Sequence, residues 1–156
     1  MTAHRKPSPA ARIVRELRAF DASLDLLDES VAAALEISRS DLRAIEIVSR
    51  HGSVTSGALA RHLGLTTGSV TTLVDRMTMK GFFQRSSDPN DRRRVIIQIT
   101  DEGIRREREF FGRLGAEMAN RLSRFSPRDL EVIAEFLSAG RLLVDAARAR
   151  IDRREV

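Results

Sequence analysis

Residues 65–103 read LTTGSVTTLVDRMTMKGFFQRSSDPNDRRRVIIQITDEG, and this stretch decides the fold. Thr66 or Thr67 can cap a helix at its start, because both side chains can accept a hydrogen bond from the first helical turn. The helix is expected to run to about Lys80, where Gly81 suits a helix end. The first half of the stretch therefore predicts one helix with a polar outer face.

The second half of the stretch predicts a β-hairpin. Phe82 and Phe83 lead a first strand, and residues 95–99, VIIQI, alternate as a return strand. Between the strands, Asp88 and Pro89 suit the first two positions of a type I turn. The hairpin follows the helix directly and carries three consecutive arginines near its tip.

A shorter helix is expected just before the stretch, from Thr55 as its N-cap to Leu63, with Gly64 in a left-handed turn. Two helices joined in this way form a helix-turn-helix, and the hairpin that follows makes a winged helix-turn-helix. We expect this unit to span residues 38–100, beginning at a capping box of Ser38 and Asp41. The shared inner face is expected to contain Leu59, Leu63, Leu65, Val70, Leu73, Val74 and Met77.

Amphipathic helices are expected on both sides of the winged unit, because apolar residues there recur three or four apart. A winged helix does not need these stripes, so we expect residues 11–35 and 101–152 to pack against a second copy of the chain. The predicted fold class is mainly α with a small β-hairpin wing, and its intertwined terminal helices form a homodimer. Residues 1–10 are expected to be a flexible basic tail. The expected dimer contacts are Ile13, Leu17, Leu130, Ile133, Leu137 and Val144.

Composition narrows the function. The 156 residues carry a net charge of +5, which favours a polyanionic partner. There is no cysteine, which excludes disulfides, thiolate catalysis and cysteine-ligated zinc. The histidines, His4, His51 and His62, form no ligand-spaced cluster, so we expect no metal and no cofactor. No signal peptide and no membrane-spanning segment is recognised, so we expect a cytoplasmic protein without membrane contact.

Short hydroxyl side chains cluster on the outer face of the helix that starts the stretch. Near a helix N-terminus, such side chains suit contacts with phosphate oxygens and base edges in a major groove. For any single residue an ordinary surface position is the better explanation, but the cluster favours DNA contact. The expected contacts are Thr67, Ser69, Thr71, Thr72 and Arg76.

The arginine run occupies the tip of the hairpin. A charge run is usually a solvated face, but side chains at a turn project furthest from the body, and arginine favours a narrow, electronegative minor groove. We expect Asp91, Arg92, Arg93 and Arg94 to form a DNA-binding wing, in which Asp91 fixes the rotamer of Arg93.

The stretch resembles the MarR family of transcriptional regulators. The family's V-D-R-x-x-x-K-G segment is matched by residues 74–81, and its D-P-x-D-x-R wing with a following L-T-x-x-G by residues 88–103, with Ile99 replacing the leucine. Thr72 stands where many relatives carry arginine, and Arg94 where many carry glycine. The resemblance implies a triangular homodimer that binds a palindromic operator in double-stranded DNA as a repressor. It gives Thr67, Ser69, Thr71, Thr72 and Arg76 the recognition-helix role and Arg93 the minor-groove role.

The resemblance also implies a small aromatic or anionic effector, bound between the dimer helices and the DNA-binding lobe. Leu17, Phe20, Leu24, Leu42 and Phe111 can line such a pocket, although as lone apolar residues they fit an ordinary core better. No nucleophile elbow, phosphate loop or histidine-carboxylate set is found, so no catalytic residue is expected. The alternative is a winged-helix module for general nucleic-acid packaging or protein interaction, which a weak, uniform DNA footprint would reveal.

Overall fold

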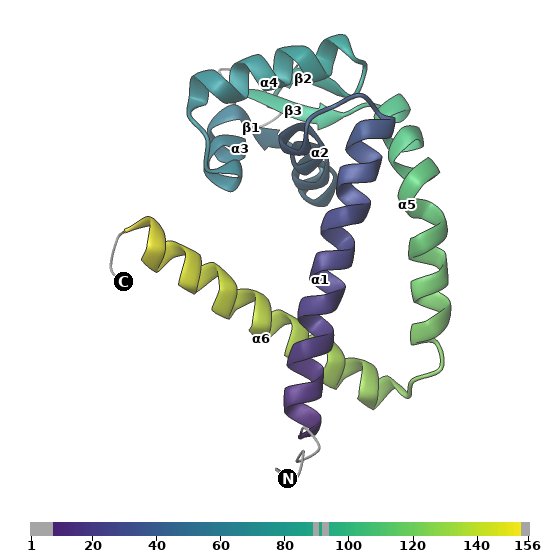
Figure 1. Cartoon of the computed structure of the whole chain (residues 1–156). Helices are drawn as coiled ribbons and strands as arrows, with labels where there is room; N and C mark the ends of the chain where they lie inside the picture. Colours follow the sequence, from purple (N-terminus) through teal and green to yellow (C-terminus); the bar gives the residue numbers. More distant parts are fainter. Residues whose placement is uncertain (1–7, 89–90, 92–93, 154–156) are drawn as a thin grey trace. The chain divides into compact units, whose positions relative to one another are not determined.

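The computed structural model describes residues 8–88, 91 and 94–153 of the chain. Its contacts divide the chain into two compact units, one ending at Arg108 and the other beginning at Glu109. Figure 1 shows the elements of both units. No helix in these described ranges is long and apolar enough to cross a membrane.

Helix α1 (Pro9–Ala34) opens the first unit. Ser8 caps it by accepting a backbone N–H at 3.2 Å, and proline is favoured at the first helical position. The helix therefore starts earlier than the apolar stripe suggests, and residues 9 and 10 belong to it rather than to the expected tail. Its buried residues are Val31 and Ala32, near the end that packs against α2. This packing places α1 in the same unit as the winged helix.

Three helices make the helix-turn-helix region: α2 (Arg39–His51), α3 (Ser56–Leu63) and α4 (Thr67–Met79). Each begins after the residue expected to cap it, with Ser38, Thr55 and Thr66 accepting from the first turn. Gly64 joins α3 to α4 in the left-handed region, at φ 67°. The expected caps of these helices and the left-handed turn at Gly64 are confirmed.

The wing belongs to a three-stranded antiparallel sheet with strand order β1-β3-β2. Strands β2 (Phe83–Ser87) and β3 (Val95–Ile99) form the expected hairpin, with Phe83 opposite Ile99 and Ser87 opposite Val95. Strand β1 (Val54–Thr55) pairs with β3 on its other side and was not expected. A strand of two residues is too short to show an alternation of apolar and polar side chains, so the sequence pattern does not predict it.

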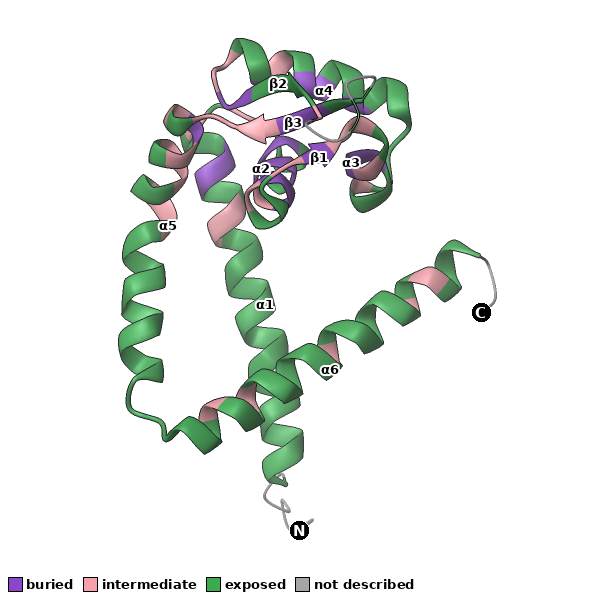
Figure 2. Ribbon diagram, turned by 180° about the vertical axis from the view of Figure 1, so that it is seen from behind, coloured by how far each residue is buried: buried purple, intermediate pink, exposed green. Residues whose placement is uncertain are grey.

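The core of the first unit lies between α2, α3, α4 and the sheet, where Figure 2 shows the buried residues gathered. Phe82 and Phe83 are among its largest fully buried side chains. Leu65 is a correction: it was expected on the inner face, but it is 38% exposed. It lies in the turn before α4 rather than within a helix, so the helical periodicity does not fix its direction.

Helix α5 (Asp101–Leu122) starts in the first unit and continues into the second, which also holds α6 (Pro127–Asp152). Ser126 and Asp129 form a capping box at the start of α6. No residue of α6 is buried in the single chain, and Figure 2 shows this helix almost entirely exposed. Large apolar side chains on α6 therefore face solvent, among them Leu137 and Val144.

Candidate nucleic-acid interface

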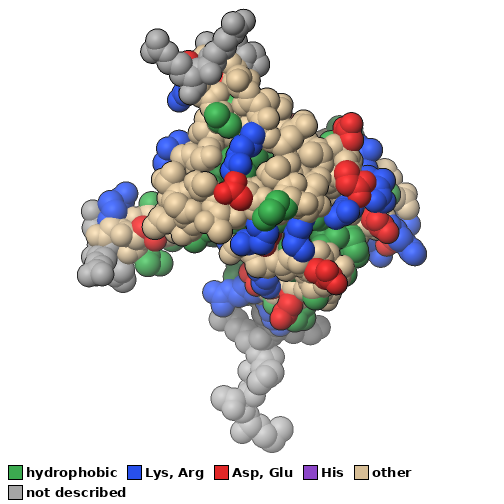
Figure 3. All heavy atoms as spheres, turned by 90° about the horizontal axis from the view of Figure 1, so that it is seen from above, with side chains coloured by type: hydrophobic (Ala, Val, Ile, Leu, Met, Phe, Trp, Pro, Cys, Tyr) green, Lys and Arg blue, Asp and Glu red, His purple; other side chains and the backbone are tan. Residues whose placement is uncertain are grey.

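Helix α4 separates an apolar inner face from a polar outer one. Its inner residues are fully or nearly fully buried: Val70, Leu73, Val74 and Met77. The hydroxyl residues expected to contact DNA, Thr67, Ser69, Thr71 and Thr72, are all exposed. Figure 3 looks down on this side of the first unit, where most of the visible surface is backbone or uncharged polar side chain, with Lys and Arg side chains and some Asp, Glu and apolar side chains among it.

The hydroxyls of this face differ in what they can still donate. Thr71 donates to the carbonyl of Thr67 at 3.0 Å, and Thr72 donates to the carbonyl of Gly68 at 3.3 Å. Thr66 and Ser69 hydrogen-bond to each other at 2.9 Å across the N-cap. Thr71 and Thr72 therefore present methyl groups and acceptor oxygens outward, which suit thymine methyls and exocyclic amines in a major groove.

The side chain of Arg76 forms an ion pair with Asp41 on α2. Its Nη2 donates to Oδ1 of Asp41 at 2.5 Å and its Nε to Oδ2 at 3.2 Å, a two-bond contact between α4 and α2. Asp41 is 1% exposed, and it also closes the capping box by accepting the N–H of Ser38 at 3.0 Å. Burial acts to raise the pKa of Asp41, but the bonds from Arg76 and Ser38 outweigh burial and hold it below its usual range. Arg76 thus orients the recognition helix, and its direct DNA contact stays a prediction.

A second ion pair ties α4 to the wing. Nη1 of Arg85, on β2, lies 2.6 Å from Oδ1 of Asp75. The two charged residues of the V-D-R segment therefore reach in different directions, Asp75 to the wing strand and Arg76 to α2. The sequence did not reveal either partner. Asp41 lies 35 residues before Arg76 in the chain, and Arg85 lies on a different element, β2.

The wing loop is closed by backbone hydrogen bonds. Asp88 N–H donates to the carbonyl of Arg94 at 2.9 Å, and Arg94 N–H donates to the carbonyl of Asp91 at 2.8 Å. Asp91 N–H donates to the carbonyl of Asp88 at 3.3 Å, the bond that the expected turn requires. Asp91 and Arg94 are exposed, whereas Arg92 and Arg93 lie outside the described residues.

The expected dimer and pocket residues are distributed over both units. Of the expected dimer contacts, Ile13, Leu17, Leu137 and Val144 are exposed and Leu130 and Ile133 half-buried. Of the expected pocket residues, Leu17, Phe20 and Leu24 are exposed, Leu42 is buried, and Phe111, in the second unit, is half-buried. Both sets remain predictions.

The structure brings two histidines together that the sequence keeps apart. The rings of His51, at the end of α2, and His62, on α3, stack with centroids 5.0 Å apart. Among the residues that the structure describes, no three His, Asp or Glu side chains are grouped so as to hold a metal ion.

The comparisons with known proteins agree with this geometry. The MarR family model matches residues 37–95. The chain is 35% identical over 112 residues to the HTH-type transcriptional regulator YcgE of Bacillus subtilis (strain 168), covering 72% of this chain and 73% of that protein. S. aureus MepR F27L bound to an oligodeoxyribonucleotide matches with a TM-score of 0.55 at 19% identity, over 85% of this chain and 97% of MepR. NadR in complex with 4-hydroxyphenylacetate matches with a TM-score of 0.59 at 18% identity, over 89% and 96% of the two chains. The chain belongs to the MarR family of helix-turn-helix transcriptional regulators.

Proposed function

We propose that the protein is a sequence-specific DNA-binding repressor that binds a palindromic operator as a homodimer. The observation that carries this proposal is α4, whose exposed hydroxyl face is held in place by ion pairs at two consecutive residues, Asp75 and Arg76. A face that must enter a major groove benefits from a fixed orientation, because a preorganised surface loses less conformational freedom on binding.

The wing supplies the strongest positive charge in this proposal. Arg76 is paired with Asp41 and Arg85 with Asp75, so these two guanidinium groups already have anionic partners. Arg94 is exposed at the base of the wing loop, next to the other two arginines of the run. We therefore assign base contacts to Thr71 and Thr72, and the phosphate and minor-groove contacts to the arginine run.

A homodimer accounts for the apolar side chains of the terminal helices. Ile13 is 51% exposed and Val144 68% exposed, and neither is among the residues that we assign to the DNA contact. Burying such side chains against a second copy removes apolar surface from water at about 25 cal/mol per Å². Two copies related by a two-fold axis would also present two α4 helices to one palindrome.

Release by a small aromatic or anionic effector completes the proposal. The NadR structure holds 4-hydroxyphenylacetate, and effector response is consistent with family membership. Leu17, Phe20, Leu24, Leu42 and Phe111 are proposed as the pocket lining, and DNA as the target implies a cytoplasmic location. The proposal includes no catalytic step.

The test is a selection followed by quantitative binding. The full chain is used to select duplexes from a random library, and binding of the selected duplex is measured by fluorescence anisotropy at several salt concentrations. We expect an inverted repeat, and an affinity that falls about a thousandfold or more between roughly 50 and 200 mM salt. Thr71→Val with Thr72→Val, which keeps the shape of both side chains, should relax base preference, whereas Thr78→Val should not. Equal affinity for unrelated duplexes would instead identify a packaging module.

A further inference from the structure

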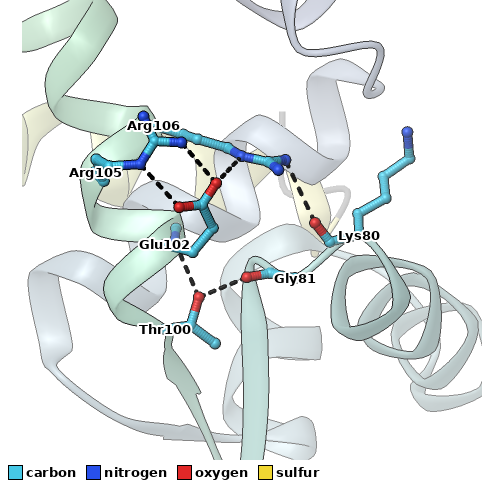
Figure 4. Close-up of polar contacts among 7 residues, drawn as sticks. Lys80, Gly81, Thr100, Glu102, Arg105 and Arg106 are labelled. Atoms are coloured by element: carbon cyan, nitrogen blue, oxygen red, sulfur yellow. Dashed lines mark hydrogen bonds and ion pairs between the residues drawn. The ribbon is translucent and has the colours of Figure 1, made fainter.

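The segment between α4 and β2 is fastened to the first turn of α5, as Figure 4 shows. The hydroxyl of Thr100 donates to the carbonyl of Gly81 at 2.5 Å, and its oxygen accepts the N–H of Gly103 at 2.9 Å. The N–H of Thr100 also donates to the carbonyl of Phe82 at 2.9 Å. One residue thus joins the end of the recognition helix to the start of α5.

Gly103 allows this close approach. A Cβ at this position would lie 2.8 Å from the carbonyl oxygen of Phe82 and 2.8 Å from Cγ1 of Ile99. Both distances are shorter than a carbon atom tolerates, and one neighbour is backbone. The first turn of α5 therefore lies directly against the residues that follow α4, and little freedom remains between them.

Arg106 adds a second fastening, one turn further along α5. Its Nη1 donates to the carbonyl of Lys80 at 3.4 Å, and its guanidinium lies over the buried ring of Phe82, 5.1 Å from the centroid. Glu102 accepts from Nε of Arg106 at 2.7 Å and from Arg105 through two bonds, so the carboxylate fixes the direction of Arg106. A cation held over an aromatic ring in this way is favourable.

The segment that follows α4 is also hydrogen-bonded to the residues just after α1. Nζ of Lys80, the C-cap of α4, donates to the carbonyl of Glu36 at 2.8 Å, just beyond the end of α1. Glu36 has φ 54°, a left-handed conformation, and this bond satisfies its carbonyl. The end of the recognition helix is therefore bound to two helices that also carry the exposed apolar stripes.

We propose that Thr100 and Arg106 are positioning residues for operator recognition: they fix α4 against the first turns of α5 and thereby set the half-site separation that the dimer accepts. This inference rests on the proposed function, since α4 carries the base contacts and α5 runs on into the proposed dimer segment. Removing the contacts that Thr100 and Arg106 make with residues 80–82 changes no atom of the DNA-contacting face. It lets the packed core that carries α4 pivot against α5 as one body, so contact with one half-site persists while the fixed spacing between two half-sites is lost.

The spacing of half-sites gives a direct measurement. Each base pair inserted at the centre of an operator moves one half-site by about 3.4 Å and rotates it by roughly 35°. We would take the duplex selected by the wild-type chain, lengthen its centre by one or two base pairs, and prepare a third duplex with a single half-site. Affinities are measured for wild type, Thr100→Val, Thr100→Ser, Arg106→Lys and Thr78→Val. Thr78 is the matched control, because its hydroxyl bonds only within α4, to the carbonyl of Val74 at 2.8 Å.

We expect the wild type to lose about tenfold in affinity on the lengthened duplexes, comparable to one mismatched base pair. Thr100→Val and Arg106→Lys should lose about threefold or less, while Thr100→Ser and Thr78→Val keep the wild-type loss. All variants should bind the single half-site within about twofold of wild type. A purely structural role for Thr100 would weaken every duplex by the same factor and leave these ratios unchanged, which would overturn the proposal.

Two further outcomes separate the possible failures. If Thr100→Val does not fold, Arg106→Lys, which keeps the charge, decides the question, and a wild-type spacing loss in that variant overturns the inference. If the wild-type chain selects no sequence at all, the proposed function fails before any variant is compared.

Discussion

Arg76 and Asp41 stand 35 residues apart in the chain, yet they form a two-bond ion pair between the recognition helix and α2. The carboxylate is buried, whereas the side chain of Arg76 is 42% exposed. The pair therefore has one end in the core and one end at the surface that we assign to DNA. Its physical consequence is that removing the arginine leaves a charge in the core without its main counter-ion.

Arg76→Gln should lower the free energy of unfolding clearly. Breaking a fully buried ion pair costs about 3–5 kcal/mol, and because Arg76 is partly exposed we expect a smaller loss, about 1–3 kcal/mol. Urea denaturation at pH 7 measures it. Arg113→Gln is the control, since Arg113 pairs with the exposed Glu117 at 2.9 Å, and it should change stability by less than about 0.5 kcal/mol. Equal losses in the two variants would show that the ion pair between Arg76 and Asp41 contributes no more to the free energy of unfolding than an exposed pair does.

Stability should also fall with acidification. The folded pKa of Asp41 is lowered, so its contribution is fully present above the ordinary carboxyl pKa of about 3.9 and is lost as the pH falls through the lowered folded value. The bonds from Arg105 and Arg106 lower the pKa of the partly exposed Glu102 to about 2, which acts in the same direction. Unfolding followed from pH 6 to pH 2 should show a falling free energy below about pH 4. In Arg76→Gln this slope should be shallower, and an unchanged slope would remove Asp41 from the explanation.

Local rules explain what the sequence predicts well. The caps at Ser38, Thr55 and Thr66 and the turn at Gly64 depend on residues within four positions of each other, so they can be found without the fold. The helix order and the hairpin follow from these boundaries together with the apolar periodicity. The apolar stripe does not reveal the start of α1, because Ser8 and Pro9 precede its first residue.

Long-range contacts explain what the sequence does not predict. The bond from Lys80 to Glu36 spans 44 residues, and that from Arg76 to Asp41 spans 35. No periodicity links such positions, and each side chain alone is compatible with an exposed surface. The hydroxyl face of α4 could be predicted because it lies on one helix, but the residues that orient that helix come from α2, β2 and α5 and from the segments that follow α1 and precede α5.

The dimer prediction is tested on α6. Leu137 is exposed in the single chain, and Leu137→Glu would place a charge in the proposed dimer contact. Sedimentation at sub-micromolar concentration should show a dimer for wild type and a monomer or unfolded chain for the variant, because an unpaired charge is costly in an apolar interface. Ala139→Glu adds the same charge two residues further on, on the opposite side of a 3.6-residue helix, and should leave the dimer intact. A folded wild-type monomer at that concentration would contradict the prediction.

The wing prediction concerns the three consecutive arginines. We expect Arg93 to enter the minor groove and Arg92 and Arg94 to contact phosphates or remain solvated, because the tip of a wing reaches beyond the groove that α4 fills. Arg93→Ala should then cost about 1–3 kcal/mol per contact, and it should weaken discrimination at A·T-rich flanks, where a narrow groove attracts arginine. Arg92→Ala and Arg94→Ala should weaken binding to all sequences alike, and each should lower the salt slope by about one if it contacts a phosphate. Asp91→Ala should reproduce part of the Arg93 loss without unfolding the chain, because an exposed pair contributes little stability.

Anisotropy titrations on duplexes with A·T and G·C flanks separate these effects. Equal, sequence-independent losses for all three arginines would mean that the run is only a positive patch, and minor-groove reading by the wing would have to be abandoned.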